Sequence, residues 1–355
     1  MISAIKTIRT DNVIPYENLA LEHVLTRHVR EGECILFLWQ NRDTVVIGKN
    51  QNAWEECRVD WLDAHGGYLA RRLSGGGAVY HDLGNLNFSL ITRSEDYDTA
   101  RQSEVILRAV RRLGVPAERT GRNDLEAEGR KFSGHAFYEH RGCWCHHGTL
   151  MMDVNLERMQ EALSVPQAKL RSRGVSSVRS RVVNLKTWCP SLDREQMETA
   201  LTEAFEEVYG LQREVLGPER VSAAEVKETA ERLASKEWIL GRRIPFTAVL
   251  EERFRWGGIR LEMSVERGRI AECACWSDAM DEQMIPLIGK ALEGCLYRGE
   301  EMARRVMNLT WESTAQDAVQ RTQMLEDVVR MIRVQTGSND RKGDNRYGTE
   351  TDTAL

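Results

Sequence analysis

Short apolar runs along the chain predict a series of β-strands. Strict alternation over residues 85–90 predicts a strand with one apolar and one polar face. The apolar face consists of Leu86, Phe88 and Leu90. Two further apolar runs, 35–39 and 44–47, are separated by polar residues and predict a strand pair joined by a turn. Residues 119–154 contain short apolar runs broken by glycines, which indicates a β-meander.

Helices are predicted between these strands by apolar spacing and by capping residues. Apolar positions at helical spacing follow Pro15, a residue that favours the first turn of a helix. Thr99 with Gln102 fits a capping box that opens a helix. The other predicted helix starts are Asp193 and Ser222, and Gly210 is the predicted end of the helix that begins at Asp193.

The pattern changes near residues 241–245 and predicts two domains. The first covers residues 1–241. A strand hairpin and then helical patterns follow, and they predict a smaller α+β domain over residues 246–335. Residues 337–355 offer few apolar side chains to a core, so we expect a disordered tail.

A glycine run within residues 71–89 is the most informative stretch. Two arginines precede it, and a predicted strand follows it. Glycines allow a ligand to lie against the main chain, successive amides can form an anion-binding nest, and arginines add positive charge. The stretch therefore predicts a site for phosphate or carboxylate. The glycines precede neither a Lys-Ser/Thr pair nor a helix, which excludes a P-loop and a dinucleotide fingerprint.

Two other segments carry candidate chemistry. Lys131 lies in a predicted strand, on the face opposite Phe132, where its ammonium could bridge two oxygens of a ligand. An exposed lysine without such a role fits the same pattern. Residues 169–185 are rich in cations and serines and contain Gly174, which fits a loop that closes over an anion or a solvated surface.

Composition narrows the classes of function. The 355 residues carry a net charge of −5, and the basic segment lacks aromatic neighbours, so we expect no nucleic-acid binding. We expect no membrane segment and no signal peptide, and the eight scattered cysteines favour the reducing cytoplasm. Cys143, Cys145 and His147 alternate along one strand at a repeat of about 7 Å, too wide for tetrahedral zinc. Metal ligands are left unassigned.

Several motifs, in this order, resemble the lipoate–protein ligase family. They are RRLSGGGAVYHDLGN, GRNDL, RKFSG, HHGTLM and GVSSVRSRVVNL in the first domain, and FRWGGIRLE and GCLYRGEEM in the second. The second-domain motifs resemble the two-domain bacterial type. The resemblance implies a biotin ligase-like, class II synthetase-like α/β (α+β) fold, with a mixed sheet, helices and an α+β accessory domain.

The resemblance also implies an activity, with ATP and Mg²⁺ as cofactors. Lipoate would attack the α-phosphate of ATP to give lipoyl-AMP, and a lysine of a lipoyl domain would then take the lipoyl group. The implied acceptors are the E2 subunits of 2-oxo acid dehydrogenases, the H protein of glycine cleavage, or both.

The family's site residues carry over to matching positions of this chain. Lys131 is the implied catalytic residue and also contacts ATP and lipoate. The other implied ATP- and lipoate-binding residues are Arg72, Gly75, Gly76, Gly77, Ala78, Val79, Tyr80, Asn123 and Asp124. The implied adenylate-binding loop consists of Gly174, Val175, Ser176, Ser177, Val178, Arg179, Ser180 and Arg181.

Three other readings stay open. A relative of the same fold could move octanoyl groups from acyl carrier protein without ATP, with Cys143 or Cys145 as its nucleophile. A transferase could use pre-formed lipoyl-AMP. A non-enzymatic paralogue is disfavoured, because both Arg72 and Lys131 are present.

Overall fold

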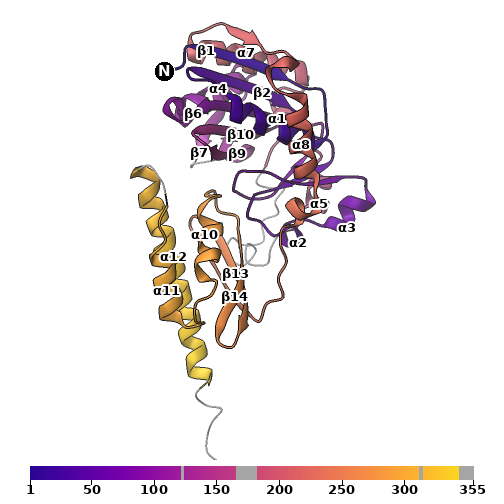
Figure 1. Ribbon diagram of the computed structural model, residues 1–355. Coiled ribbons are helices and arrows are strands. Elements are labelled where there is room, and N and C mark those ends of the chain that lie inside the picture. The colour runs from indigo at the N-terminus through magenta and orange to yellow at the C-terminus, as the bar shows by residue number, and fades with distance from the viewer. Residues whose placement is uncertain (121–123, 165–181, 312–314, 344–355) are drawn as a thin grey trace, which may run out of the picture. The chain divides into compact units, whose positions relative to one another are not determined.

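The computed structural model describes residues 1–120, 124–164, 182–311 and 315–343. The chain forms two compact units, Met1–Gly241 and Arg242–Leu355 (Figure 1). Each unit has its own apolar core.

An eight-stranded mixed sheet is the centre of the first unit. Its strand order is β11-β1-β2-β6-β10-β9-β8-β7. β11, β1 and β2 run parallel, and each later neighbour in the order is antiparallel. The strands are β1 (Ala4–Arg9), β2 (Glu33–Trp39), β6 (Asn85–Arg93), β7 (Ala117–Thr120), β8 (Asp124–Ala127), β9 (Arg130–His140), β10 (Cys143–Met151) and β11 (Arg213–Val215).

A smaller sheet carries the segment of residues 72–78, here called the glycine loop. Its order is β4-β3-β5, with β3 parallel to β4 and antiparallel to β5. The strands are β3 (Thr44–Ile47), β4 (Tyr68–Arg71) and β5 (Val79–His81). The glycine loop connects β4 to β5, so the two strands fix both of its ends.

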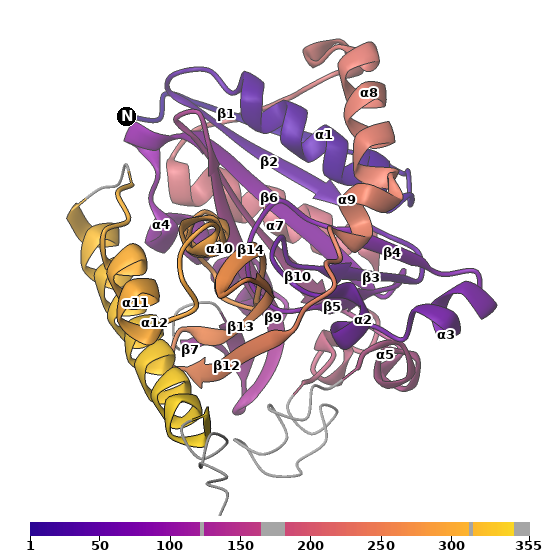
Figure 2. The same ribbon diagram turned by 60° about the horizontal axis from the view of Figure 1, so that its bottom comes forward.

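Helices cover both faces of the large sheet. Figure 2 shows α1 beside α8 and α4 beside α7, and both pairs are in contact. The helices of this unit are α1 (Pro15–His28), α2 (Ala53–Glu56), α3 (Val59–Ala64), α4 (Thr99–Arg112), α5 (Leu156–Ala162), α7 (Arg194–Tyr209), α8 (Ala223–Ala234) and α9 (Lys236–Leu240). Short 3₁₀ helices lie at Ser94–Asp96, Leu185–Thr187 and Pro218–Arg220.

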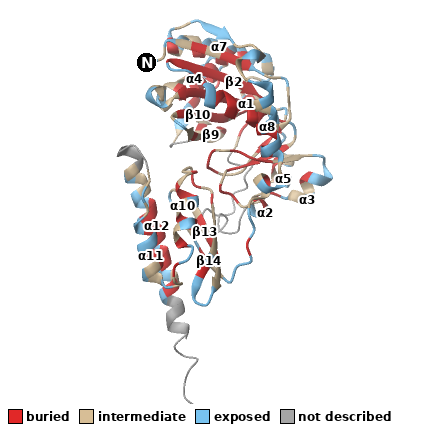
Figure 3. Ribbon diagram, in the orientation of Figure 1, coloured by how far each residue is buried: buried red, intermediate tan, exposed pale blue. Residues whose placement is uncertain are grey.

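Alternation along the strands distributes side chains between two apolar clusters. Leu36 and Phe88 pack with α4 and α7, whereas Phe37 and Trp39 pack with α1 and α8. The sheet is accordingly buried beneath partly exposed helices (Figure 3). This arrangement confirms the predicted mixed α/β core, and Leu86 and Leu90 lie with Phe88 on one face as predicted.

Local predictions are confirmed in most places. Strands β7 to β10 form the predicted meander. Asp193 and Gln196 form a capping box, and Gly210 ends α7 with a left-handed φ of 65°. The Ser222 side chain caps α8.

Two local predictions were wrong. The runs 35–39 and 44–47 form strands but do not pair, because β2 pairs with β1 and β6, and both of its edges are therefore occupied. Helix α4 is capped by Asp98, whose carboxylate accepts from the Arg101 amide at 3.0 Å. Gln102 is buried and contacts His146 instead of reaching back to the cap.

The second unit packs helices on a three-stranded antiparallel sheet, β12-β13-β14. Its elements are β12 (Ala248–Phe254), β13 (Gly257–Glu266), β14 (Arg269–Ser277), α10 (Met284–Leu292), α11 (Gly299–Met307) and α12 (Ala315–Gly343). The predicted hairpin is formed by β13 and β14. Helix α12 continues through residues 337–343, which were predicted to be disordered because their apolar content is low, and residues 344–355 lie outside the described part.

In the described part of the chain, no helix combines the length and apolar character needed to cross a bilayer.

Candidate functional site

The glycine loop is packed closely against the turn that follows β3. A Cβ added to Gly48 would lie 2.1 Å from the carbonyl oxygen of Gly76, so only glycine fits at position 48. The Lys49 amide donates to the Ser74 carbonyl at 2.9 Å. Gly76 itself has a φ of 88°, which disfavours any side chain there. The loop therefore has a defined shape despite its three glycines.

Arg72 lies beneath this loop and is 6% exposed. Its Nη2 donates to the carbonyls of Gly75 at 2.6 Å and Gly77 at 2.8 Å, and its Nη1 donates to the Val46 carbonyl at 3.1 Å. Burial lowers the pKa of Arg72 to about 10, so the guanidinium is still charged at neutral pH. Its donors thus point at the loop's own carbonyls.

The direction of those carbonyls determines what the loop presents on its other side. In a trans peptide the N–H points opposite to the C=O, and the described residues contain no cis bond. Because the carbonyls of Gly75 and Gly77 point inward to Arg72, the amides of Gly76 and Ala78 point away from it. Gly77, Ala78 and Val79 are half-buried and accessible to a ligand, while Gly75 and Gly76 are buried. The amides of Gly76 and Ala78 are thus directed to the side of the loop opposite Arg72, the side on which the predicted nest would hold an anion.

Arg71, the last residue of β4, binds elements that flank the loop. It is 3% exposed and donates to the carbonyl of Gln51 at 2.6 Å and to that of Ile239 in α9 at 2.8 Å. The Trp238 indole donates back to the Arg71 carbonyl at 2.8 Å. Arg71 therefore ties β4, the turn after β3 and α9 together.

Lys131 lies on β9 and forms an ion pair with Asp124 at 2.8 Å, with its side chain 35% exposed. The register shifts between Leu125 and Glu126, so that Leu125 pairs with Ser133 and Glu126 pairs with Lys131. Phe132 is the extra residue of this β-bulge, and its ring is fully buried. Lys131 was predicted to lie on the face opposite Phe132, and a partly exposed lysine beside a buried ring agrees with that prediction.

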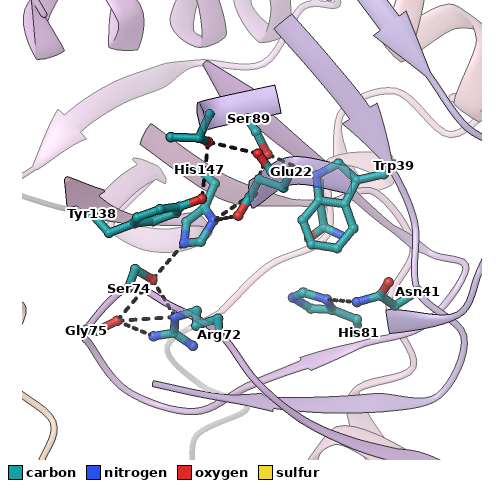
Figure 4. A network of polar contacts seen from close by, with 12 residues as sticks. Glu22, Trp39, Asn41, Arg72, Ser74, Gly75, His81, Ser89, Tyr138 and His147 are labelled. Atoms are coloured by element: carbon teal, nitrogen blue, oxygen red, sulfur yellow. Dashed lines mark hydrogen bonds and ion pairs between the residues drawn. The ribbon is translucent and has the colours of Figure 1, made fainter. Parts of the chain in front are cut away.

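Glu22, His147 and Ser74 form a buried hydrogen-bonded chain, shown in Figure 4. The Nδ1 of His147 is 2.8 Å from Glu22 Oε2, and its Nε2 is 2.7 Å from Ser74 Oγ. Ser74 Oγ in turn accepts from Arg72 Nε at 2.9 Å. From the sequence, His147 was considered only as a metal ligand, and Glu22 gave no signal because it is one of several polar residues in the predicted helix after Pro15.

Other histidines of this unit are buried in separate polar contacts. His81 is 3% exposed, its Nδ1 is 3.2 Å from Asn41, and burial together with the charge of Arg72 lowers its pKa to about 3. His146 links Gln102 to His135, with 2.8 Å between the two imidazoles. Burial, followed by the charge of Lys131, lowers the pKa of His135 to about 3.

A metal site is geometrically conceivable at one place. The ligand atoms of Glu22, Cys145 and His147 all lie within 4.8 Å of one another and are buried. The spacing argument against a metal was thus wrong for the pair Cys145 and His147, because their side chains converge toward Glu22 on α1. The same atoms already have protein partners, since His147 binds Glu22 and Ser74.

The predicted cysteine nucleophiles are poorly suited to catalysis. Cys143 and Cys145 are 2% and 0% exposed, and burial raises the pKa of the Cys145 thiol well above its ordinary value. A neutral, buried thiol is a weak nucleophile.

The remaining predicted site residues are only partly visible. Tyr80 is buried and donates to Asp43 at 2.9 Å, so it stabilises β5 against β3. Asn123 and the predicted adenylate-binding loop, Gly174–Arg181, lie outside the described residues.

Comparison with known proteins gives the family. The profile of the lipoyl protein ligase A/B catalytic domain matches residues 14–206, and that of the bacterial lipoate protein ligase C-terminus matches residues 243–330. The chain belongs to this family of lipoate–protein ligases.

Solved structures agree with this assignment. LipL1 of P. falciparum in complex with lipoate is 25% identical, with a TM-score of 0.76 over 91% of this chain and 100% of its own. A bi-partite lipoate protein ligase from Thermoplasma acidophilum, described with its E2 lipoyl domain as an archaeal lipoylation system, is 27% identical, with a TM-score of 0.60 over 70% of this chain and 100% of its own. A lipoate-protein ligase A bound with ATP is 26% identical, with a TM-score of 0.58 over 68% of this chain and 99% of its own.

Proposed function

We propose that this chain activates lipoate with ATP to form lipoyl-AMP and then transfers the lipoyl group to a lysine of lipoyl-domain proteins. In the first step a lipoate carboxylate oxygen attacks the α-phosphorus, and the bond to pyrophosphate breaks. In the second step the lysine amine attacks the acyl carbonyl, loses a proton, and AMP leaves.

The observation that carries this proposal is a series of contacts along β10 and β9 that leads from the glycine loop to the Lys131 ammonium. His147 contacts the glycine loop through Ser74 and shares a strand face with Thr149, two residues further along β10. Thr149 Oγ1 accepts from the Gly134 amide, and the Lys131 ammonium lies over Gly134. Outward amides and an ammonium can together bring a carboxylate and a triphosphate into contact despite their mutual repulsion.

Lys131 serves both steps in this proposal. Negative charge grows on the α-phosphate in the first step and on the carbonyl oxygen in the second, and one ammonium between them stabilises both transition states. Because Lys131 pairs with Asp124, the lysine has to exchange that partner for the ligand. Asp124 would then be free to help hold Mg²⁺, and the ion would shield the charge of the leaving pyrophosphate.

The acceptors in this proposal are lipoyl domains of E2 subunits, the glycine cleavage H protein, or both. The relative from Thermoplasma acidophilum belongs to a lipoylation system with an E2 lipoyl domain, which supports the first class. The buried thiols of Cys143 and Cys145 weigh against transfer from acyl carrier protein through a cysteine.

The experiment is pyrophosphate release from ATP with lipoate and no acceptor protein. Lipoate-dependent release, with lipoyl-AMP bound to the protein, supports the proposal. Absence of pyrophosphate release, combined with acyl transfer from octanoyl carrier protein or from supplied lipoyl-AMP, would overturn the adenylation step. The chain would then be an acyl transferase.

A further inference from the structure

The buried chain Glu22–His147–Ser74 joins a helix, a strand and the glycine loop. The three residues are 1%, 6% and 0% exposed. Because a carboxylate accepts hydrogen bonds, Nδ1 of His147 donates to Glu22, and Nε2 on the other side of the ring is hydrogen-bonded to the Ser74 hydroxyl. Ser74 Oγ also accepts from Arg72 Nε.

The inner end of this chain is itself fixed. Ser89 Oγ donates to Glu22 Oε2 at 2.6 Å, and the Trp39 indole donates to Ser89 Oγ at 3.0 Å. Both residues come from central strands of the large sheet, β6 and β2. The Glu22 carboxylate is therefore anchored to two central strands of the large sheet (Figure 4).

The outer end acts on the part of the loop with the least intrinsic order. Three consecutive glycines lose more backbone entropy on folding than other residues, so external contacts must hold their conformation. Ser74 directly precedes them, and Arg72 binds the carbonyls of Gly75 and Gly77. Fixing Ser74 and Arg72 fixes the peptide planes whose amides form the nest.

We propose that Glu22 and His147 are positioning residues for adenylation, which hold Ser74 and Arg72 so that the glycine loop keeps its amides directed at the anionic substrates. This inference rests on the proposed function. Neither residue touches the reacting atoms in this mechanism, and Ser74 is an anchor rather than a nucleophile.

A double-mutant cycle tests the connection, with lipoate-dependent pyrophosphate release as the readout. Ser74→Ala and Glu22→Gln should each lower kcat/KM by about 10- to 100-fold, since misplacement of binding groups by about 1 Å has effects of that size. If they act through one chain, the double variant should be no worse than the poorer single variant. Multiplication of the two fold-losses would overturn the proposal.

The matched control is His146→Gln. His146 is equally buried and adjacent on β10, but it contacts Gln102 and His135 instead of the loop. The fold-loss in kcat/KM of the double variant His146→Gln/Ser74→Ala should equal the product of the two single fold-losses. The coupling energy between His146→Gln and Ser74→Ala should therefore be smaller than that between Glu22→Gln and Ser74→Ala. Equal coupling energies would show a general loss of packing and would also overturn the proposal.

A second measurement does not depend on the activity. Hydrogen exchange of the peptide covering residues 72–80 should accelerate in Ser74→Ala and Glu22→Gln, and stay unchanged in His146→Gln. Unchanged exchange in Ser74→Ala, which only removes a hydroxyl, would contradict the proposal even if Glu22→Gln fails to fold. Absence of pyrophosphate release by the unmodified protein would contradict the proposed function, and the exchange experiment would still test the positioning chain.

Discussion

The ammonium of Lys131 occupies the space that a side chain on Gly134 would need. A Cβ at position 134 would lie 2.8 Å from Lys131 Nζ and 2.9 Å from Cε. The β-bulge at Phe132 brings this about, because the extra residue puts positions 131 and 134 on the same face of β9. Gly134 therefore determines where the ammonium lies.

Gly134→Ala should displace the Lys131 ammonium and lower the rate of lipoyl-AMP formation by about 10-fold or more. The fold should change little, because the displaced atoms are the end of a flexible side chain. Rates of adenylation and thermal unfolding measure the two effects. Gly337→Ala is the matched control, since a Cβ there meets no atom within 4 Å. A Gly134→Ala variant with full activity would show that the resting position of Lys131 is irrelevant to catalysis.

Lys131→Ala should reduce adenylation by at least about 100-fold, the size of effect seen when a group that stabilises transition-state charge is removed. Its ion pair with Asp124 is partly exposed, and such pairs contribute about 1 kcal/mol or less, so the melting temperature should hardly change.

Lys186→Ala provides the control for that variant. Lys186 pairs with Asp153 at 2.9 Å and has a side chain 37% exposed, close to the 35% of Lys131. Equal activity losses in the two variants would refute a special role for Lys131.

Arg71→Lys should destabilise the first unit by about 3 kcal/mol or more. A lysine cannot reproduce the fork that reaches the carbonyls of Gln51 and Ile239, and a buried carbonyl left unpaired costs about 1–3 kcal/mol. Urea unfolding measures the loss. Arg232→Lys, at an exposed arginine over the Trp238 ring, should have little effect on stability. Equal losses of stability in the two variants would show that the contacts of Arg71 to these carbonyls are not responsible.

Stability should fall on acidification below about pH 6.5, the ordinary pKa of histidine. Burial lowers the pKa of His81 and His135 to about 3 in the folded protein, so between these values the unfolded chain binds protons that the folded chain does not. This stabilisation is fully present above about pH 6.5 and is lost as the pH falls toward 3. Unfolding free energies at pH 7.5 and 5.5 measure it. His135→Gln should reduce the change of unfolding free energy with pH by about 1.4 kcal/mol per pH unit. An unchanged pH dependence would contradict the lowered pKa of His135.

The sequence determined the local structure and the charge-bearing motifs. Alternation in Leu86, Phe88 and Leu90 and the capping box at Asp193 are set by neighbouring residues, so both were predictable. The glycine run and Lys131 were recognisable for a similar reason, because their chemistry is written in consecutive residues.

Only the tertiary structure decided what these motifs contact. Arg72 was predicted as a ligand contact, but burial directs its donors to the loop carbonyls. Glu22 and Ser74 lie 52 positions apart in the printed sequence and meet through His147, a relationship that no local period encodes. Hydrogen-bond partners of buried polar groups depend on how distant elements pack, because each such group must find its partner within the folded core.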